Sequence, residues 1–74
     1  MRFAVGTVVH VRNMSDGSHV LARVDGVSRY IEEDRLDPTG KLVLVPKGYY
    51  YQVSYDRHIS VSNVHERRLT PALR

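Results

Sequence analysis

The stretch that decides the fold is Tyr49-Tyr50-Tyr51-Gln52-Val53-Ser54-Tyr55-Asp56, which holds four of the six aromatic residues of the chain. In an extended strand, successive side chains point to opposite faces. One face of this stretch is therefore mostly aromatic and carries Tyr49, Tyr51, Val53 and Tyr55. The alternation predicts a strand whose aromatic face covers a small core. Tyr50 is expected on the outside, where its ring would stack on a nucleic-acid base or be exposed.

Alternating segments on both sides of this stretch predict an all-β chain. The expected strands are residues 3–12, 19–24, 27–31, 41–45, 49–56 and 59–61. Gly6 lies inside the first of them and indicates a bend or bulge. No segment keeps a helical period long enough for a packed helix. Five to six short strands separated by turns favour a closed or nearly closed barrel.

Three short motifs predict how these segments are joined. Asp25-Gly26 is typical of a two-residue hairpin turn, because both central positions of that turn need a positive φ. Residues 37–40 read Asp-Pro-Thr-Gly, the preference of a type I turn. Asn63, followed three residues later by Glu66, resembles a capping box and predicts one short helical turn that Pro71 ends.

The charge of the chain is unevenly distributed. The net charge is +3, but four of the eight acidic residues lie in residues 32–37 together with one arginine, so the remainder carries ten basic and four acidic residues. Nine of the eleven basic residues are arginine, whose planar group suits phosphate and carboxylate. Two readings stay open for the acidic segment, a docking site for a basic peptide or a solvated loop.

The size and residue types restrict the function classes. A chain of 74 residues allows one domain, expected over residues 1–74, and its end soon after the last predicted element favours a domain of a longer protein. The chain has no cysteine, and its four histidines lack metal-ligand spacing, so we expect neither a metal nor a cofactor. No Gly-x-Ser-x-Gly elbow or glycine-rich phosphate loop is present, so we expect no enzyme. No apolar run is long enough for a membrane helix, and we expect an intracellular protein.

The order of several motifs resembles the Tudor and chromo-barrel domains of the Royal superfamily. These motifs are Val5-Gly6-Thr7-Val8-Val9, Asp16-Gly17-Ser18 before Ala22-Arg23-Val24, Tyr51-Gln52-Val53-Ser54-Tyr55-Asp56, and Val64 to Pro71 with Arg68-Leu69. The likeness is closest to the knotted-Tudor or chromo-barrel modules of MYST-type acetyltransferase complexes. It implies a bent, SH3-like five-stranded barrel, a nuclear location, and a partner that is a basic or methylated histone-like peptide.

The resemblance also implies where such a peptide would bind. Tyr55 matches an aromatic residue of the methyl-ammonium cage, and Asp56 matches the adjacent acid. Further candidate walls without such a match are Tyr30, Tyr49 and Tyr51. His19 stands where these barrels usually carry an aromatic residue near the first hairpin, and the chain has no tryptophan, the ring that binds cations best.

Other function classes remain open beside this one. An SH3-like module that binds DNA or RNA would use a basic and aromatic set: Lys47, Tyr50, Arg57, Arg67 and Arg68. A structural domain would instead bind other subunits of a complex. The plasmid-type dihydrofolate reductases are SH3-like barrels of similar length, but their Val-Gln-Ile-Tyr motif has no counterpart in this sequence.

Overall fold

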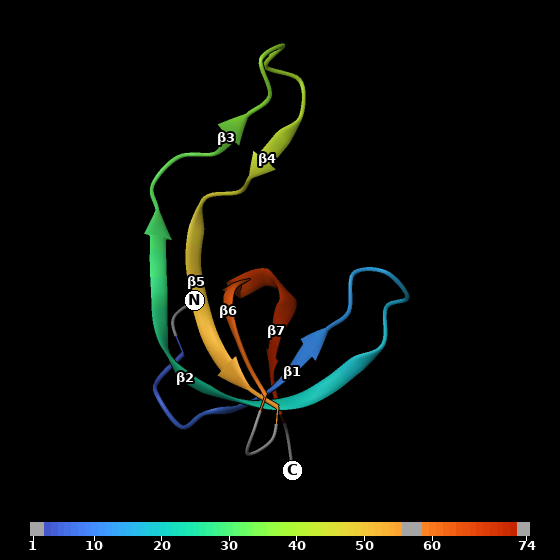
Figure 1. Ribbon diagram of the computed structural model, residues 1–74, viewed down its shortest axis with the longest axis vertical. Helices are drawn as coiled ribbons and strands as arrows, with labels where there is room; N and C mark the ends of the chain where they lie inside the picture. The colour runs from blue at the N-terminus through green and yellow to red at the C-terminus, as the bar shows by residue number, and fades with distance from the viewer. Residues whose placement is uncertain (1–2, 56–58, 73–74) are drawn as a thin grey trace.

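The computed structural model describes residues 3–55 and 59–72, and its regular elements there are strands apart from one short 3-10 helix (Figure 1). In chain order the elements are β1 (Val8–Arg12), β2 (His19–Ile31), β3 (Arg35–Leu36), β4 (Val43–Val45), β5 (Gly48–Ser54), β6 (Ser60–His65), the 3-10 helix η1 (Glu66–Arg68) and β7 (Leu69–Pro71). The predicted all-β class and the short helical turn near the C-terminus are both confirmed.

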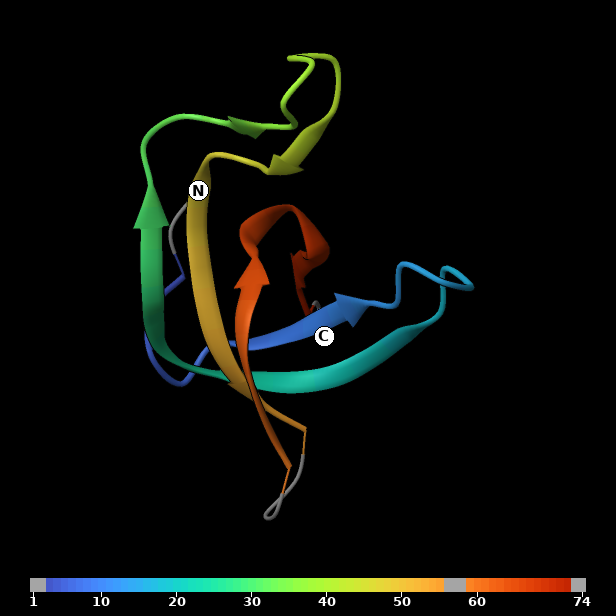
Figure 2. The same ribbon diagram turned by 45° about the horizontal axis from the view of Figure 1, so that its top comes forward.

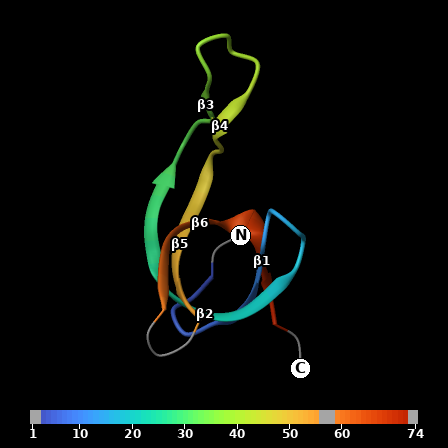
Figure 3. The same ribbon diagram turned by 45° about the vertical axis from the view of Figure 1, so that its right-hand side comes forward.

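Five strands form one antiparallel sheet in the order β6-β5-β2-β1-β7, whereas β3 and β4 pair only with each other as a second, two-stranded sheet. β5 is the aromatic strand, and it lies between β2 and β6. The C-terminal strand β7 returns to pair with the N-terminal strand β1. The large sheet is strongly curved (Figures 1 and 3).

β2 contains two irregularities that bend the sheet. It also contains Asp25-Gly26, where the predicted hairpin turn is wrong. Asp25 and Gly26 do not form a hairpin, and neither has the positive φ that such a turn needs. Instead β2 continues through both residues, and its pairing with β5 shifts register between Val24 and Gly26 and again between Val27 and Arg29. Extra residues of this kind form β-bulges, which bend a strand while its partner stays paired.

The inner face of the curved sheet encloses the core. Tyr51 and Val53 of β5 are fully buried there, as the alternation predicted, and Tyr49 and Tyr55 pack against the same cluster. The other core residues are Phe3, Val9, Val11, Ala22, Val24, Val64 and Leu69. The Tyr51 hydroxyl accepts a hydrogen bond from the Phe3 backbone N–H (2.8 Å), so the one polar atom of the largest fully buried side chain has a partner.

Tyr50 lies on the opposite face of β5, and the prediction that it is exposed is wrong. Its side chain is only 7% exposed. The hydroxyl donates to the Pro46 carbonyl (2.6 Å), and the ring meets the His65 ring edge-on with 4.9 Å between centroids. Alternation assigns a side chain to a face, but it does not say what covers that face. Here the segment before β5 and the end of β6 cover it, so Tyr50 has no free ring face for a base.

The capping prediction for Asn63 is also wrong. Asn63 belongs to β6, where it has a positive φ of 60° and its N–H donates to the Ser28 hydroxyl (3.1 Å). The residue that caps η1 is His65, whose Nδ1 accepts from the Arg67 N–H (3.0 Å). Pairing between Tyr50 and His65 extends β6 this far, so the helical turn starts only after it.

Residues 32–47, which we call the arm, leave the sheet after β2 and return to it at β5. The arm contains β3 and β4 and projects beyond the ends of β2 and β5 (Figures 1 and 2). The predicted turn at residues 37–40 is confirmed, because the Gly40 N–H donates to the Asp37 carbonyl (3.0 Å). The Asp37 carboxylate accepts from the Thr39 hydroxyl (2.8 Å) and from the Lys41 N–H (3.0 Å).

Candidate functional site

The residues predicted as a recognition site do not all lie together. Tyr55 is half-buried against the core at the far end of β5, and its N–H donates to the Ile59 carbonyl (3.0 Å). Asp56 lies outside the described residues, so the pairing of Tyr55 with Asp56 stays a prediction. Tyr51 is fully buried and has no ring face for a ligand. His19 is the first residue of β2, where its ring lies 6.0 Å from that of His10.

Tyr30 is the predicted residue that the fold does place in an open aromatic site. It pairs across the strands with Tyr49, and the two ring centroids are 4.7 Å apart at an interplanar angle of 42°. The Tyr30 side chain is 54% exposed, whereas Tyr49 is half-buried and continues to Tyr51 at 6.4 Å. Tyr49 therefore lies between the buried ring of Tyr51 and the exposed ring of Tyr30. We call Tyr30 and Tyr49 the tyrosine pair.

The tyrosine pair borders a shallow pocket of about 340 Å³. The residues that line it are Tyr30, Ile31, Glu32, Lys47, Gly48, Tyr49 and Glu66. Two carboxylates and one ammonium group therefore surround two aromatic rings. An aromatic face attracts a cation through the negative charge density of the ring. The pocket combines this attraction with negative charge, which suits a positively charged side chain.

Gly48 lines this pocket, and because it has no side chain, two neighbouring side chains approach it closely. Gly48 has a φ of 126°, and a Cβ at this position would collide with the Glu66 carboxylate and lie 3.0 Å from His65 Nε2. Both neighbours are tied to the start of β5: the Tyr49 N–H donates to Glu66 Oε1 (3.2 Å), and His65 Nε2 lies 2.7 Å from the Lys47 carbonyl. Because His65 Nδ1 accepts a hydrogen bond, the neutral ring carries its proton on Nε2 and donates to that carbonyl.

The Glu66 carboxyl group has a lowered pKa. Its partial burial acts to raise the pKa, but hydrogen bonds to the carboxylate, among them the one from the Tyr49 N–H, and the neighbouring His65 lower it. The net effect is a pKa below the ordinary value of 4.5. At neutral pH the pocket therefore presents a carboxylate at Glu66.

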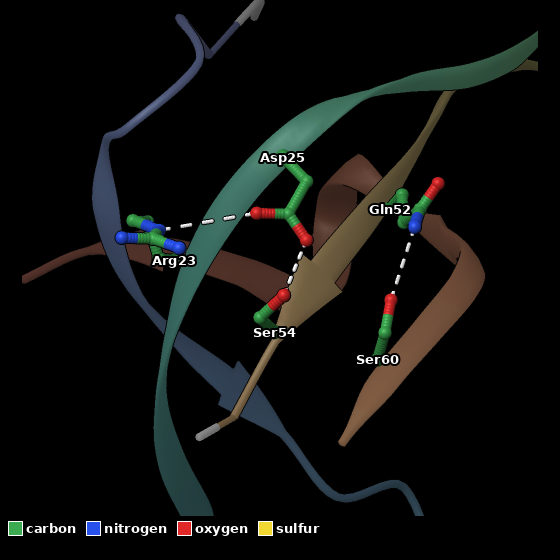
Figure 4. Close-up of polar contacts among 5 residues, drawn as sticks. All are labelled: Arg23, Asp25, Gln52, Ser54 and Ser60. Atoms are coloured by element: carbon green, nitrogen blue, oxygen red, sulfur yellow. Dashed lines mark hydrogen bonds and ion pairs between the residues drawn. The ribbon is translucent and has the colours of Figure 1, made fainter. Parts of the chain in front are cut away.

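A second polar cluster lies on the outer face of β2, β5 and β6 (Figure 4). The Asp25 carboxylate accepts a hydrogen bond from the Ser54 hydroxyl and lies 3.9 Å from Arg23 Nε. Beside it, Gln52 Nε2 donates to the Ser60 hydroxyl (3.0 Å). A nucleophilic serine needs an adjacent general base that a third group orients, and Ser54 is instead held by a carboxylate next to an arginine. We read the cluster as cross-strand contacts that fix the Asp25 bulge.

The residues predicted to bind nucleic acid do not form one surface either. Lys47 lines the pocket of the tyrosine pair. The Nε of Arg68 donates to the carbonyl of Arg12 at the end of β1 (3.1 Å). Arg67, in η1, is exposed. Arg57 lies outside the described residues, and Tyr50 is buried as described above.

The described residues contain neither a metal-binding group nor a membrane-spanning helix. In residues 3–55 and 59–72, no group of three or more histidine, cysteine, aspartate or glutamate side chains could hold a metal ion. Over the same part of the chain, no helix is long and apolar enough to cross a bilayer.

Comparison with protein families, with curated proteins and with solved structures finds no match for this chain.

Sequence reasoning missed Glu66 as a pocket residue. It named Glu32 only within the acidic segment, and it named Tyr49 as a candidate wall without placing it beside Tyr30. One signal could have found the tyrosine pair. Tyr30 and Tyr49 flank the acidic and turn-rich stretch at equal distance from its ends, two residues before Glu32 and two after Lys47. If that stretch is an excursion between two paired strands, the two tyrosines must be neighbours.

Proposed function

We propose that this chain is a non-enzymatic binding module that recognises a basic or methylated histone-like peptide through the tyrosine pair. In this proposal the large sheet is an SH3-like barrel of the Tudor or chromo-barrel type. Its strand order supports that reading, because β7 follows a 3-10 turn and returns to β1. The site lies at Tyr30 and Tyr49, not at the Tyr55 end of β5 that the resemblance indicates.

The observation that carries the proposal is the close packing of two tyrosine rings, one of them exposed, beside two carboxylates. A methylated ammonium group gains from a ring face and has a low cost of desolvation, and such contacts contribute about 0.5–2 kcal/mol each. Glu32 is exposed and able to attract an approaching lysine or arginine. Lys47 also lines the pocket, and its ammonium group opposes a cation.

The proposed recognition is tested by titrating the module with lysine peptides that carry no methyl group or three. The wild-type protein is expected to prefer the trimethylated peptide. Tyr30→Leu removes the aromatic ring and keeps a smaller apolar side chain, and it should weaken trimethyl-lysine binding by about 2- to 30-fold. Tyr30→Phe is the matched control, because it keeps the ring and loses only the hydroxyl, and it should bind nearly as the wild type does.

The competing nucleic-acid function gives a different result in the same experiment. Binding to short DNA or RNA that weakens steeply with salt and ignores Tyr30→Leu would contradict the peptide proposal. Equal affinity for the methylated and unmethylated peptides, unchanged in both Tyr30 variants, would also contradict it.

A further inference from the structure

The arm exposes apolar side chains that the rest of the described chain does not cover. Leu42 and Leu44 are 63% and 62% exposed, and Leu36 and its cross-strand partner Val43 are each about half exposed. Leu42 and Leu44 flank Val43 along the chain, so alternation turns them to the face opposite Val43. Apolar side chains are therefore exposed on both faces of the arm. We call these four residues the arm surface.

The shape of the arm does not depend on burying these side chains. Backbone and carboxylate hydrogen bonds hold it: the Asp37 N–H donates to the Leu42 carbonyl (2.9 Å), and the Lys47 N–H donates to the Asp34 carboxylate (2.7 Å). Among the described elements, β3 and β4 make most of their contacts with each other. A two-stranded hairpin with an uncovered apolar surface is marginally stable in water, and it gains most from packing on a partner.

The charge around the arm surface indicates what kind of partner fits. The outgoing half of the arm, residues 32–37, carries four acidic residues and one arginine, and the returning half adds two lysines, so the acidic excess lies in the outgoing half. A partner surface should therefore combine exposed apolar side chains with basic ones.

The outward face of β1 and the start of β2 has this composition. Its cross-strand pairs are Val8 with Arg23, His10 with Leu21, and Arg12 with His19. Val8 and Leu21 are exposed apolar residues, and Arg12 and Arg23 are exposed basic residues. Residues 8–12 and 19–23 contain no acidic residue, although the Asp25 carboxylate lies 3.9 Å from Arg23 Nε. We call these six residues the basic face.

The arm and the basic face of one molecule lie too far apart to meet. β1 pairs with residues 19–23 at the start of β2, whereas the arm begins after Ile31 at its end. The arm also points away from β1 (Figure 1). A contact between the two surfaces therefore requires two molecules.

We propose that the arm of one copy of this chain docks on the basic face of a second copy. The leucines of the arm pack against Val8 and Leu21, and the acidic residues pair with Arg12 and Arg23. If two copies exchange arms reciprocally, a closed two-fold dimer results; if the contact is made once, a free arm and a free basic face remain and assembly continues into rings or filaments. The inference rests on other observations than the proposed function, and the two share Glu32, which belongs to the arm and lines the pocket of the tyrosine pair.

The test measures the mass of the protein by light scattering after size-exclusion chromatography, over a range of protein concentration and at low and high salt. The monomer mass is 8.5 kDa. The wild type should exceed this mass increasingly as concentration rises, and high salt should reduce the effect because the acidic and basic groups are exposed. A wild type that stays monomeric at every concentration would overturn the proposal.

Two double variants test the arm and the basic face separately. Leu42→Ser with Leu44→Ser inactivates the arm, and Arg12→Glu with Arg23→Glu inactivates the basic face. Each variant alone should be monomeric, whereas an equimolar mixture should form a dimer of twice the monomer mass and nothing larger, since each copy still supplies one intact surface. Val5→Ser, an exposed apolar position outside both surfaces, is the control and should assemble like the wild type.

Three outcomes contradict the inference. If the arm variant still assembles, the arm is not the docking element. If the basic-face variant assembles alone, the arm pairs with something other than the basic face, such as a second arm. If both variants are monomeric and folded by circular dichroism but their mixture forms no dimer, the two surfaces do not bind each other.

Discussion

Replacement of Gly48 by alanine tests how the start of β5 is fixed. Two separate costs are expected at this position. The φ of 126° lies in a region that side-chain-bearing residues rarely adopt, which costs about 1–3 kcal/mol. The added Cβ would also collide with the Glu66 carboxylate and crowd the His65 ring, so both must move from their hydrogen bonds with Tyr49 and Lys47.

Two other glycines separate these costs. Gly40→Ala shares the positive φ (72°) but has nothing within 4 Å of its Cβ, so only the conformational cost of about 1–2 kcal/mol applies. Gly26→Ala has neither a positive φ nor a neighbour within 4 Å, so it should be neutral or stabilising by roughly 0.4–1 kcal/mol. The expected order of stability is therefore Gly26→Ala, then Gly40→Ala, then Gly48→Ala.

The free energy of unfolding can be measured for all three variants by urea denaturation followed by circular dichroism. Gly48→Ala should lose about 3 kcal/mol, equivalent to a fall in Tm of about 12–24 °C for a chain of this size. A loss no greater than that of Gly40→Ala would show that Glu66 and His65 do not pack against Gly48. That result would refute the close contact of these two side chains with Gly48 in the pocket lining.

Three further changes test other parts of the structure. Tyr51→Phe leaves the Phe3 N–H without its buried acceptor and should lower the free energy of unfolding by about 1–3 kcal/mol, measured in urea; an unchanged midpoint would contradict the contact. Ser28→Ala removes the hydroxyl that accepts from the Asn63 N–H, and about 1 kcal/mol should be lost in the same assay. The lowered pKa of Glu66 stabilises the fold fully above its ordinary value of 4.5, and this contribution is lost as the pH falls through the lowered folded value. Glu66→Gln should therefore flatten the fall of stability between about pH 5 and 3, and an unchanged pH profile would contradict the assignment.

Local patterns in the sequence predicted the features that depend on a few neighbouring residues. The inner face of β5 follows from alternation alone, and Tyr51 and Val53 are buried on it. The turn at residues 37–40 follows from the preferences of Asp, Pro and Gly at fixed turn positions, and the Asp37 side chain reinforces it.

Features that depend on distant pairing were not predictable in the same way. Asp-Gly suits a hairpin turn and a β-bulge alike, and the choice depends on whether β5, which is more than twenty residues away, pairs with both halves of β2. The burial of Tyr50 likewise depends on Pro46 and His65, which alternation does not take into account.

The candidate site was only half predictable for the same reason. Tyr30 and Tyr49 could each be named as an aromatic residue of a possible site, but their contact depends on the register that pairs Ile31 with Gly48 across the base of the arm. Glu66 joins them from a third segment, through a hydrogen bond to Tyr49.

The most direct test of the central claim is an NMR titration of the tyrosine-ring signals with tetramethylammonium chloride, the simplest fully methylated ammonium ion. Sodium chloride at equal ionic strength serves as the control. If the tyrosine pair receives a methylated cation, the ring signals of Tyr30 and Tyr49 shift together and saturate, while those of Tyr55 and the buried Tyr51 stay in place. Shifts confined to Tyr55, or no shift beyond that produced by sodium chloride, would contradict the claim.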